Sequence, residues 1–168
     1  MIESIQTVFT QPNLLFLLDG LRTSLVISLC VIILSILLGT LLGLVRNYEK
    51  KILGKFASFY IELFRNTPLL LWMLGCAFLM PGSTILVKGS LALFLYTAAV
   101  VAEIVRGGLN AIPKGQFEAA HSQGFSFFQT LLYIILPQTF KKIIPSLLSQ
   151  VITTIKDTSF LAGLGIME

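Results

Sequence analysis

A run of 21 residues without a charged side chain, from Leu25 to Val45, constrains this chain more than any other feature. At about 1.5 Å of rise per residue, a helix of that length covers the hydrocarbon core of a bilayer, which is about 30 Å thick. The sequence is 55% hydrophobic and 12% charged, whereas a soluble domain is roughly 45–50% apolar and about 25% charged. Such a surplus of apolar side chains needs lipid as its solvent, so the sequence predicts an integral membrane protein.

Three further apolar segments predict an all-α membrane protein, a polytopic helical bundle with four spans in one transmembrane domain of residues 1–168. The third segment is interrupted near its end by Glu103 and Arg106. The fourth contains Lys141 and Lys142, whose ammonium groups can extend to the membrane interface. The predicted spans are about 21–46, 67–87, 90–109 and 138–156, and residues 113–136 form a polar hairpin between the last two.

The basic residues are distributed unevenly between the two ends of these spans. Nine lie in the linkers that follow the first and third spans, and three lie on the opposite side. Because loops rich in lysine and arginine stay in the cytoplasm, this asymmetry predicts a cytoplasmic hairpin and an N-terminus outside. The outward loops are too short to form a ligand-binding domain, so capture of a scarce solute would need a separate protein. The nine are Arg46, Lys50, Lys51, Lys55, Arg65, Arg106, Lys114, Lys141 and Lys142, and the three are Arg22, Lys88 and Lys156.

Several classes of function find no support in the residues. The formal net charge is +4, but the basic side chains flank apolar spans and do not gather on a polar domain, which argues against nucleic-acid binding. Cys30 and Cys76 stand alone, and His121 is the only histidine, so no metal site is expected. The sequence has no Ser/His/Asp set and no nucleotide-binding glycine loop. It therefore predicts a chain that is not an enzyme and binds no cofactor.

The predicted hairpin holds the most specific pattern in the chain. Pro113 ends the preceding helix, and Gly124 permits a left-handed turn between two short helices. Ser126 and Gln129 have the spacing of a capping box for the second of these helices. Seven positions at fixed spacing resemble the EAA loop of permease subunits in bacterial ATP-binding-cassette importers: Glu118, Ala119, Ala120, Gly124, Ile134, Leu136 and Pro137.

Three other stretches resemble one subfamily of these permeases, which serves polar amino acids such as histidine, glutamine, arginine and cystine. Residues 60–70 are similar to its Glu-Leu-Phe-Arg-Gly-Thr-Pro-Leu-Leu segment, with Asn66 in place of the glycine. Asparagine also tolerates a positive φ, so the turn can survive the exchange. Residues 102–116 and 156–160 are similar to the same subfamily, and the similarity as a whole runs from about Gly20 to the end.

This resemblance implies the permease subunit of an ATP-driven importer of polar amino acids in a bacterial cell membrane. It implies an ATP-binding-cassette ATPase that uses ATP and Mg²⁺, an extracytoplasmic amino-acid-binding protein, and a second permease subunit, identical or different. Coupling to the ATPase would be the role of Glu118, Ala119, Ala120 and Gly124. Two alternatives stay open: a passive channel or ion-driven amino-acid carrier, and a membrane scaffold that recruits the ATPase without transporting.

Three ionisable residues are candidates for a substrate path. Glu103 lies inside a predicted span, where a charge usually faces the bundle interior or a wet cavity. Arg106 shares its helix face and can neutralise it. Lys156 and Asp157 close the fourth span on its outer side, where they offer opposite charges to a zwitterionic amino acid, form a gate, or simply end the helix.

Two expectations concern packing and chain length. Gly39 and Gly43 form a small-xxx-small pair that predicts close helix packing within the bundle. Residues 163–168 resemble the family's short connection into its last membrane helix, which implies a fifth helix beyond Glu168.

Overall fold

The computed structural model describes residues 10–49 and 51–165, and every regular element in them is helical. Three segments are long and apolar enough to cross a membrane, namely Gln11–Tyr48, Ile85–Asn110 and Phe127–Gly163. The predicted all-α membrane fold is confirmed. The elements are α2 (Gln11–Tyr48), α3 (Ile52–Arg65), α4 (Leu69–Leu79), α5 (Ile85–Asn110), α6 (Gly115–Ser122), α7 (Phe127–Thr130), the π-helical turn η1 (Leu131–Ile135), α8 (Leu136–Asp157) and α9 (Ser159–Gly165).

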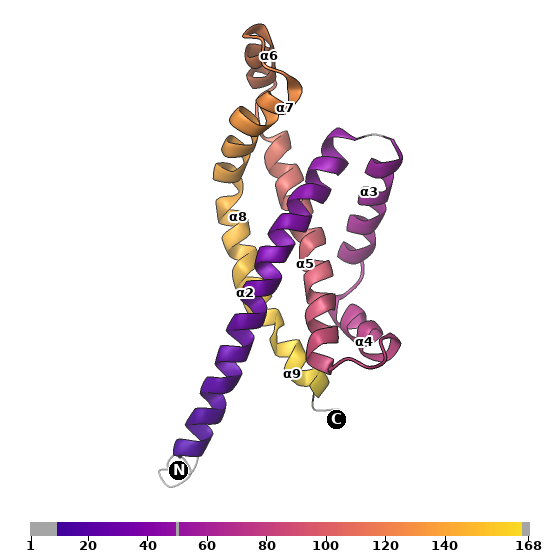
Figure 1. The fold of residues 1–168 in the computed structure, drawn as a ribbon, viewed down its shortest axis with the longest axis vertical. Coiled ribbons are helices and arrows are strands. Elements are labelled where there is room, and N and C mark those ends of the chain that lie inside the picture. The colour runs from indigo at the N-terminus through magenta and orange to yellow at the C-terminus, as the bar shows by residue number, and fades with distance from the viewer. Residues whose placement is uncertain (1–9, 50, 166–168) are drawn as a thin grey trace.

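The long helices α2, α5 and α8 pack on one another along the long axis of the molecule (Figure 1). The short helices α3 and α4 both pack on α5, with α3 near the end where α2 finishes and α4 near the other end. The pair α6 and α7 projects beyond the bundle at the first end, and α9 lies at the second. This arrangement separates the polar hairpin from the C-terminal end of α8 by the length of the bundle.

Small residues form the seam between α2 and α5. A Cβ added at Gly39 would lie 2.7 Å from the Cβ of Val101, and one added at Gly43 would lie 2.6 Å from the carbonyl oxygen of Ala102. The close packing predicted for these two glycines is therefore confirmed. The buried stripe of α2 consists of residues three or four apart: Ser28, Val31, Ser35, Gly39 and Gly43.

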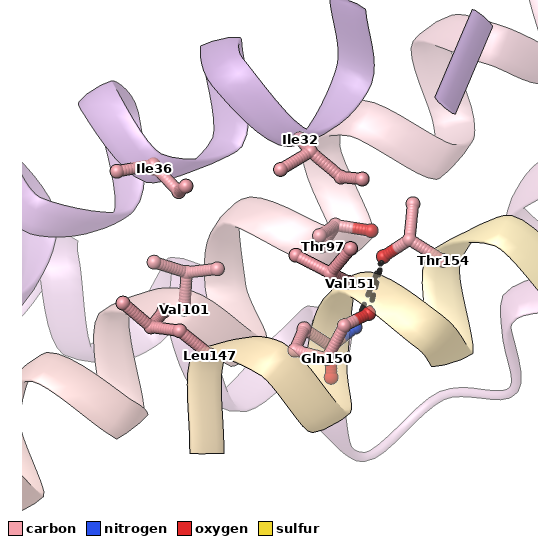
Figure 2. Close-up of a pocket in the computed structure, with 8 residues that line it drawn as sticks. All are labelled: Ile32, Ile36, Thr97, Val101, Leu147, Gln150, Val151 and Thr154. Atoms are coloured by element: carbon pink, nitrogen blue, oxygen red, sulfur yellow. Dashed lines mark hydrogen bonds between the residues drawn. The ribbon is translucent and has the colours of Figure 1, made fainter. Parts of the chain in front are cut away.

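Polar side chains also lie where α2, α5 and α8 meet; Thr97 and Thr154 are buried and Gln150 is half-buried. Gln150 Nε2 donates to the Thr154 hydroxyl oxygen at 3.4 Å (Figure 2). The Thr97 hydroxyl is buried and has no hydrogen-bond partner among the described residues. These three side chains line a pocket of about 10 Å³, which is about the space that one water molecule needs. The remaining walls are apolar: Ile32, Ile36, Val101, Leu147 and Val151.

The second predicted span, residues 67–87, is wrong as a single helix. The helix α4 ends at Leu79 after 11 residues, a length of about 16 Å that does not cross the hydrocarbon core. Gly82 has a φ of 84°, and the left-handed turn there separates α4 from α5. The helix α3, which precedes α4, supplies further helical length beside α5. The hydropathy of the sequence did not predict α3, because one face of this helix is charged. Its inner face is apolar and buries Gly54, Ala57, Ile61 and Phe64.

The hairpin and the fourth predicted span are joined by helix and not separated near Pro137. The elements α7, η1 and α8 run on without a break from Phe127 to Asp157. In η1 the N–H of Leu136 bonds to the carbonyl oxygen of Leu131, the wider i to i+5 pattern of a π-turn. Proline lacks an N–H, and the wider turn just before it keeps the helix continuous. Part of the predicted connection, residues 166–168, lies outside the described residues.

We predict that Gly39→Leu destabilises the protein in detergent, because the new side chain would be forced into Val101 and the α5 backbone. Overpacking of this kind costs about 1–3 kcal/mol, and we expect a fall of several degrees in the midpoint of thermal unfolding followed by circular dichroism. Gly20→Leu is the matched control, since it lies on the same helix and a Cβ there has no neighbour within 4 Å. Equal midpoints for the two variants would contradict the seam.

Candidate functional site

The polar hairpin consists of α6 and α7 with a left-handed glycine between them. Gly124 has a φ of 81°, and its N–H bonds to the His121 carbonyl oxygen at 3.0 Å. At the start of α7 the Ser126 hydroxyl accepts from the Gln129 N–H at 3.3 Å, and the Gln129 side chain accepts from the Ser126 N–H at 2.8 Å. The predicted glycine turn and capping box are both confirmed.

Aromatic side chains hold the hairpin against the end of α2. Tyr48, the last residue of α2, makes edge-to-face contacts with Phe127 and Phe117, with ring centroids 5.3 Å and 6.3 Å apart. Such contacts add to the free energy gained by burying the rings. Ala120 is buried on the inner side of α6, and Ile135 is buried in η1. The hairpin is therefore packed on the bundle through the end of α2.

The outward face of the hairpin is open. Glu118, Ala119 and Gly124 are exposed, and Phe128 is 78% exposed. Within the described residues Glu118 forms no ion pair. Of the four residues predicted to couple to an ATPase, three thus lie at the surface, and Ala120 lies in the packed base.

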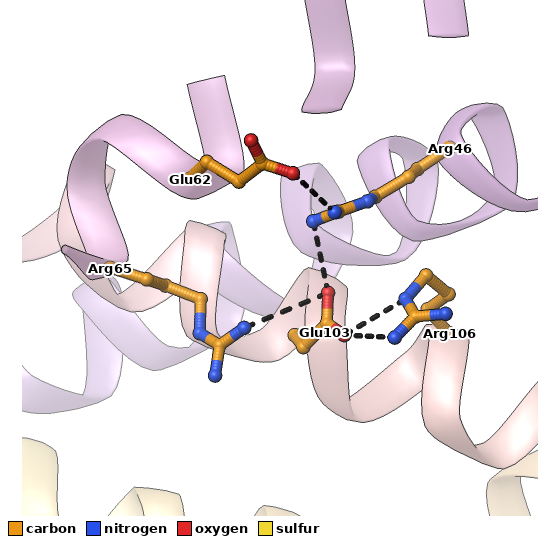
Figure 3. Close-up of polar contacts among 5 residues, drawn as sticks. All are labelled: Arg46, Glu62, Arg65, Glu103 and Arg106. Atoms are coloured by element: carbon orange, nitrogen blue, oxygen red, sulfur yellow. Dashed lines mark hydrogen bonds and ion pairs between the residues drawn. The ribbon is translucent and has the colours of Figure 1, made fainter. Parts of the chain in front are cut away.

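A charged cluster centred on Glu103 joins α2, α3 and α5 (Figure 3). Its Oε1 accepts from Arg106 Nε at 2.8 Å and from Arg106 Nη2. Its Oε2 accepts from Arg46 Nη1 at 3.1 Å and lies 3.8 Å from Arg65 Nη1. Arg46 also pairs with Glu62, with Nη2 and Oε1 2.7 Å apart. The predicted pair of Glu103 and Arg106 is confirmed, and the other members were missed.

The members of this cluster depend on one another electrostatically. Three guanidinium groups face two carboxylates, so the cluster carries one excess positive charge. The side chains of Glu103 and Arg46 are each 19% exposed, whereas that of Glu62 is 60% exposed. A partly buried charge that loses its partner is costly. Sequence alone placed Arg46 and Arg65 in the linker after the first span. The packing of α2 on α5 brings Arg46 to Glu103, and the packing of α3 on α5 brings Arg65 there.

A cavity of about 420 Å³ is lined from α3, α4, α5, α8 and α9. Arg65 and Asp157 give it one cationic and one anionic wall residue, and Gln150 lines both this cavity and the small polar pocket. A volume of this size is typical of sites for small molecules. The other lining residues are Leu69, Tyr96, Val100, Thr153 and Phe160.

The three residues predicted for a substrate path have different positions. Asp157 lines the cavity. Glu103 does not line it, but it lies next to Arg65, which does. Lys156 is exposed and lines neither the cavity nor the small pocket. Sequence reasoning did not single out Arg65 as a site residue, although it stands in the stretch that resembles the permease segment.

A bundle of apolar helices with a projecting polar hairpin and a cavity of this size is consistent with a membrane component of a transport system. The chain belongs to the family of binding-protein-dependent transport system inner membrane components, whose pattern matches residues 32–167. The family predicted from the hairpin motif is confirmed, and so is a location in the membrane.

Named relatives extend over nearly the whole chain. The probable glutamine ABC transporter permease protein GlnP of Bacillus subtilis (strain 168) is 35% identical over 164 residues, which cover 95% of this chain and 75% of the relative. The glutamate/aspartate import permease protein GltK of Escherichia coli O6:H1 is 32% identical over 169 residues, 94% of this chain and 75% of the relative.

Solved structures agree with the fold. A crystal structure of an amino acid ABC transporter with histidines superposes with a TM-score of 0.79 at 32% identity, over 88% of this chain and 71% of that one. The MetNI methionine ABC transporter, in inward facing conformations, superposes with a TM-score of 0.80 at 21% identity, over 93% of this chain and 77% of that one. The second similarity concerns the fold alone.

We predict that Glu103→Gln destabilises the bundle more than Glu62→Gln does. The first change leaves Arg65 and Arg106 without a carboxylate, and loss of a hydrogen-bonded charged partner costs about 1–3 kcal/mol. The second removes an exposed partner of Arg46 alone, which is worth about 0–1 kcal/mol. Thermal unfolding of both variants in the same detergent measures the difference. A lower midpoint for Glu62→Gln than for Glu103→Gln would rule out Glu103 as the centre of the cluster.

Proposed function

We propose that this chain is the permease subunit of an ATP-driven amino-acid importer. The observation that carries the proposal is the polar hairpin, which packs on α2 through Tyr48 and continues into α8 without a break. Relatives named as glutamine and glutamate/aspartate permeases support amino acids as the substrate class. A passive channel or an ion-driven carrier needs no such hairpin, and a scaffold needs no charged cavity.

In this proposal the outward face of the hairpin docks on a separate ATPase subunit. Glu118 offers a carboxylate to a basic residue there, while Ala119 and Gly124 allow close approach. Movement of the ATPase then displaces α6 and α7 as a unit. Because α7 continues through η1 into α8, the displacement passes along a helix to the cavity wall at Asp157.

The partners follow from the same proposal. ATP and Mg²⁺ bind to the ATPase subunit, and this chain hydrolyses nothing itself. A second permease subunit presents a second hairpin, because a pair of ATPases needs two. An amino-acid-binding protein delivers substrate on the outer side, which is the side that the charge asymmetry predicts for the N-terminus.

We assign the cavity between Arg65 and Asp157 to the substrate. A zwitterionic amino acid carries a carboxylate that suits the guanidinium of Arg65 and an ammonium that suits the carboxylate of Asp157. Tyr96 and Phe160 supply aromatic walls for its side chain. Glu103 acts indirectly, since it does not line the cavity but neutralises Arg65 while the cavity is empty. Its Oε2 lies 3.8 Å from Arg65 Nη1.

We predict that Gly124→Val uncouples ATP use from transport, because valine resists the φ of 81° that the turn requires. The strain of about 1–2 kcal/mol acts on the hairpin alone, so insertion in the membrane should be normal and ATP-driven uptake should fall about tenfold. Uptake by vesicles that contain the chain with its ATPase and binding protein measures the effect.

Gly115→Val is the control for this variant. Gly115 lies in the same hairpin, its φ is not positive, and a Cβ there meets nothing within 4 Å. Normal uptake by Gly124→Val, or an equal loss in both variants, would exclude the proposed coupling through the glycine turn. Uptake that needs no ATP at all would favour the carrier.

We predict that Asp157→Asn raises the concentration of amino acid needed for half-maximal uptake by about 10–100-fold, since a hydrogen bond to a charged group is worth about 1.5–3 kcal/mol. Lys156→Gln is the matched control, because it removes the neighbouring charge from a residue that does not line the cavity. Uptake measured against concentration separates the two. Equal values for both variants would remove the cavity from the substrate path and leave the coupling proposal intact.

A further inference from the structure

The turn between α2 and α3 borders a polar cleft that shares no lining residue with the proposed substrate cavity. The cleft has a volume of about 430 Å³ and is lined in part by Lys55, Ser58 and Glu49. The guanidinium of Arg46, also in its wall, is engaged by Glu62 and Glu103. Lys55 is therefore the basic group of the cleft wall that remains available for an anion.

A second lysine stands beside the cleft. Lys51 precedes Lys55 by one helical turn, and both are exposed. Neither forms an ion pair with another described residue. Two carboxylates line the cleft, Glu49 and Glu62. Glu62 is paired with Arg46, which leaves Glu49 against the two lysine ammonium groups. The turn between α2 and α3 closes tightly at Gly54, because a Cβ there would collide with the Glu49 carbonyl oxygen. The tight turn fixes the backbone from which the two lysine side chains extend.

An apolar stripe runs beside the row of polar residues formed by Lys51, Lys55 and Ser58 along one face of α3. Each of these three residues is followed in the chain by an exposed apolar residue. The stripe comprises Ile52, Phe56, Phe59 and Leu63, which are 70%, 68%, 65% and 39% exposed. It leads into a groove of about 480 Å³ between α2 and α3 that is lined almost wholly by apolar side chains.

Phe59 joins the two spaces, since it lines both the polar cleft and the apolar groove. A ligand that fits must be anionic at one end and hydrocarbon at the other. Soluble phosphate would use the cleft and leave the groove empty, whereas a zwitterionic lipid would bring a cation towards the lysines.

We propose that this surface binds one anionic phospholipid. The phosphate lies in the cleft against Lys51, Lys55 and the Ser58 hydroxyl, and an acyl chain passes Phe59 into the groove. Basic side chains near a membrane surface attract anionic lipid, each by a modest amount, and lysine stems pack on apolar surface while their charge stays in the headgroup layer. The inference is independent of the substrate and of ATP.

The test uses the purified chain in detergent, titrated with phosphatidylglycerol or phosphatidylcholine and followed by native mass spectrometry of the protein–lipid complex. We expect phosphatidylglycerol to bind about tenfold more tightly, and the variant with both Lys51→Gln and Lys55→Gln to lose that preference. Lys114→Gln with Lys141→Gln removes the same charge from positions outside the cleft and should keep it. Ser58→Asp places a carboxylate in the intact cleft and should abolish the preference without removing a lysine.

Three results would overturn the proposal. Equal affinity for the two lipids would show that the lysines do not select charge. Equal loss in the two double-glutamine variants would show that only net charge matters. Displacement of phosphatidylglycerol by inorganic phosphate at similar concentration would show an anion site to which the groove contributes nothing.

Discussion

The close contact of α2 with α5 determines the positions of the charged cluster and of the hairpin. Between helices in a membrane the hydrophobic effect is weak, so association depends on close backbone approach, and Gly39 and Gly43 provide it. Gly43 meets the backbone at Ala102, the residue before Glu103, and Arg46 lies one turn beyond Gly43 on α2. The same register that packs the glycines therefore brings Arg46 to Glu103, and two residues later brings Tyr48 to the hairpin.

The charged cluster transmits this register to α3. Glu103 is held by Arg106 on its own helix and by Arg46 from α2, and its contact with Arg65 at 3.8 Å is the loosest of the three. Arg65 is 45% exposed and also lines the cavity. If the cavity holds the substrate as proposed, a substrate carboxylate there competes with Glu103 for the same guanidinium. Under that proposal, occupancy of the cavity and the position of α3 relative to α5 are linked through Arg65.

The sequence predicted those features that depend on local chemistry. The turn at Gly124, the capping box of Ser126 and the pairing of Glu103 with Arg106 involve residues a few positions apart, and each is present. It did not predict α3, whose charged face looked like a loop until its buried face met α5. Nor did it predict that Arg65 and Asp157 line one cavity, because nothing local links residues on two helices so far apart in the chain.

The unbroken helix from Phe127 to Asp157 connects the hairpin to the cavity, as the proposed mechanism requires. An interruption at Pro137 would have let the hairpin move while the membrane helix stayed in place. Instead the π-turn keeps the two ends mechanically continuous, and Gln150 lies on this helix between them, in both the small polar pocket and the cavity wall. The unpaired Thr97 hydroxyl faces that pocket from α5. In the proposed mechanism, a shift of α8 against α5 keeps the bond between Gln150 and Thr154, because both residues lie on α8. A hydrogen bond that the Thr97 hydroxyl gains during the shift offsets part of the packing lost.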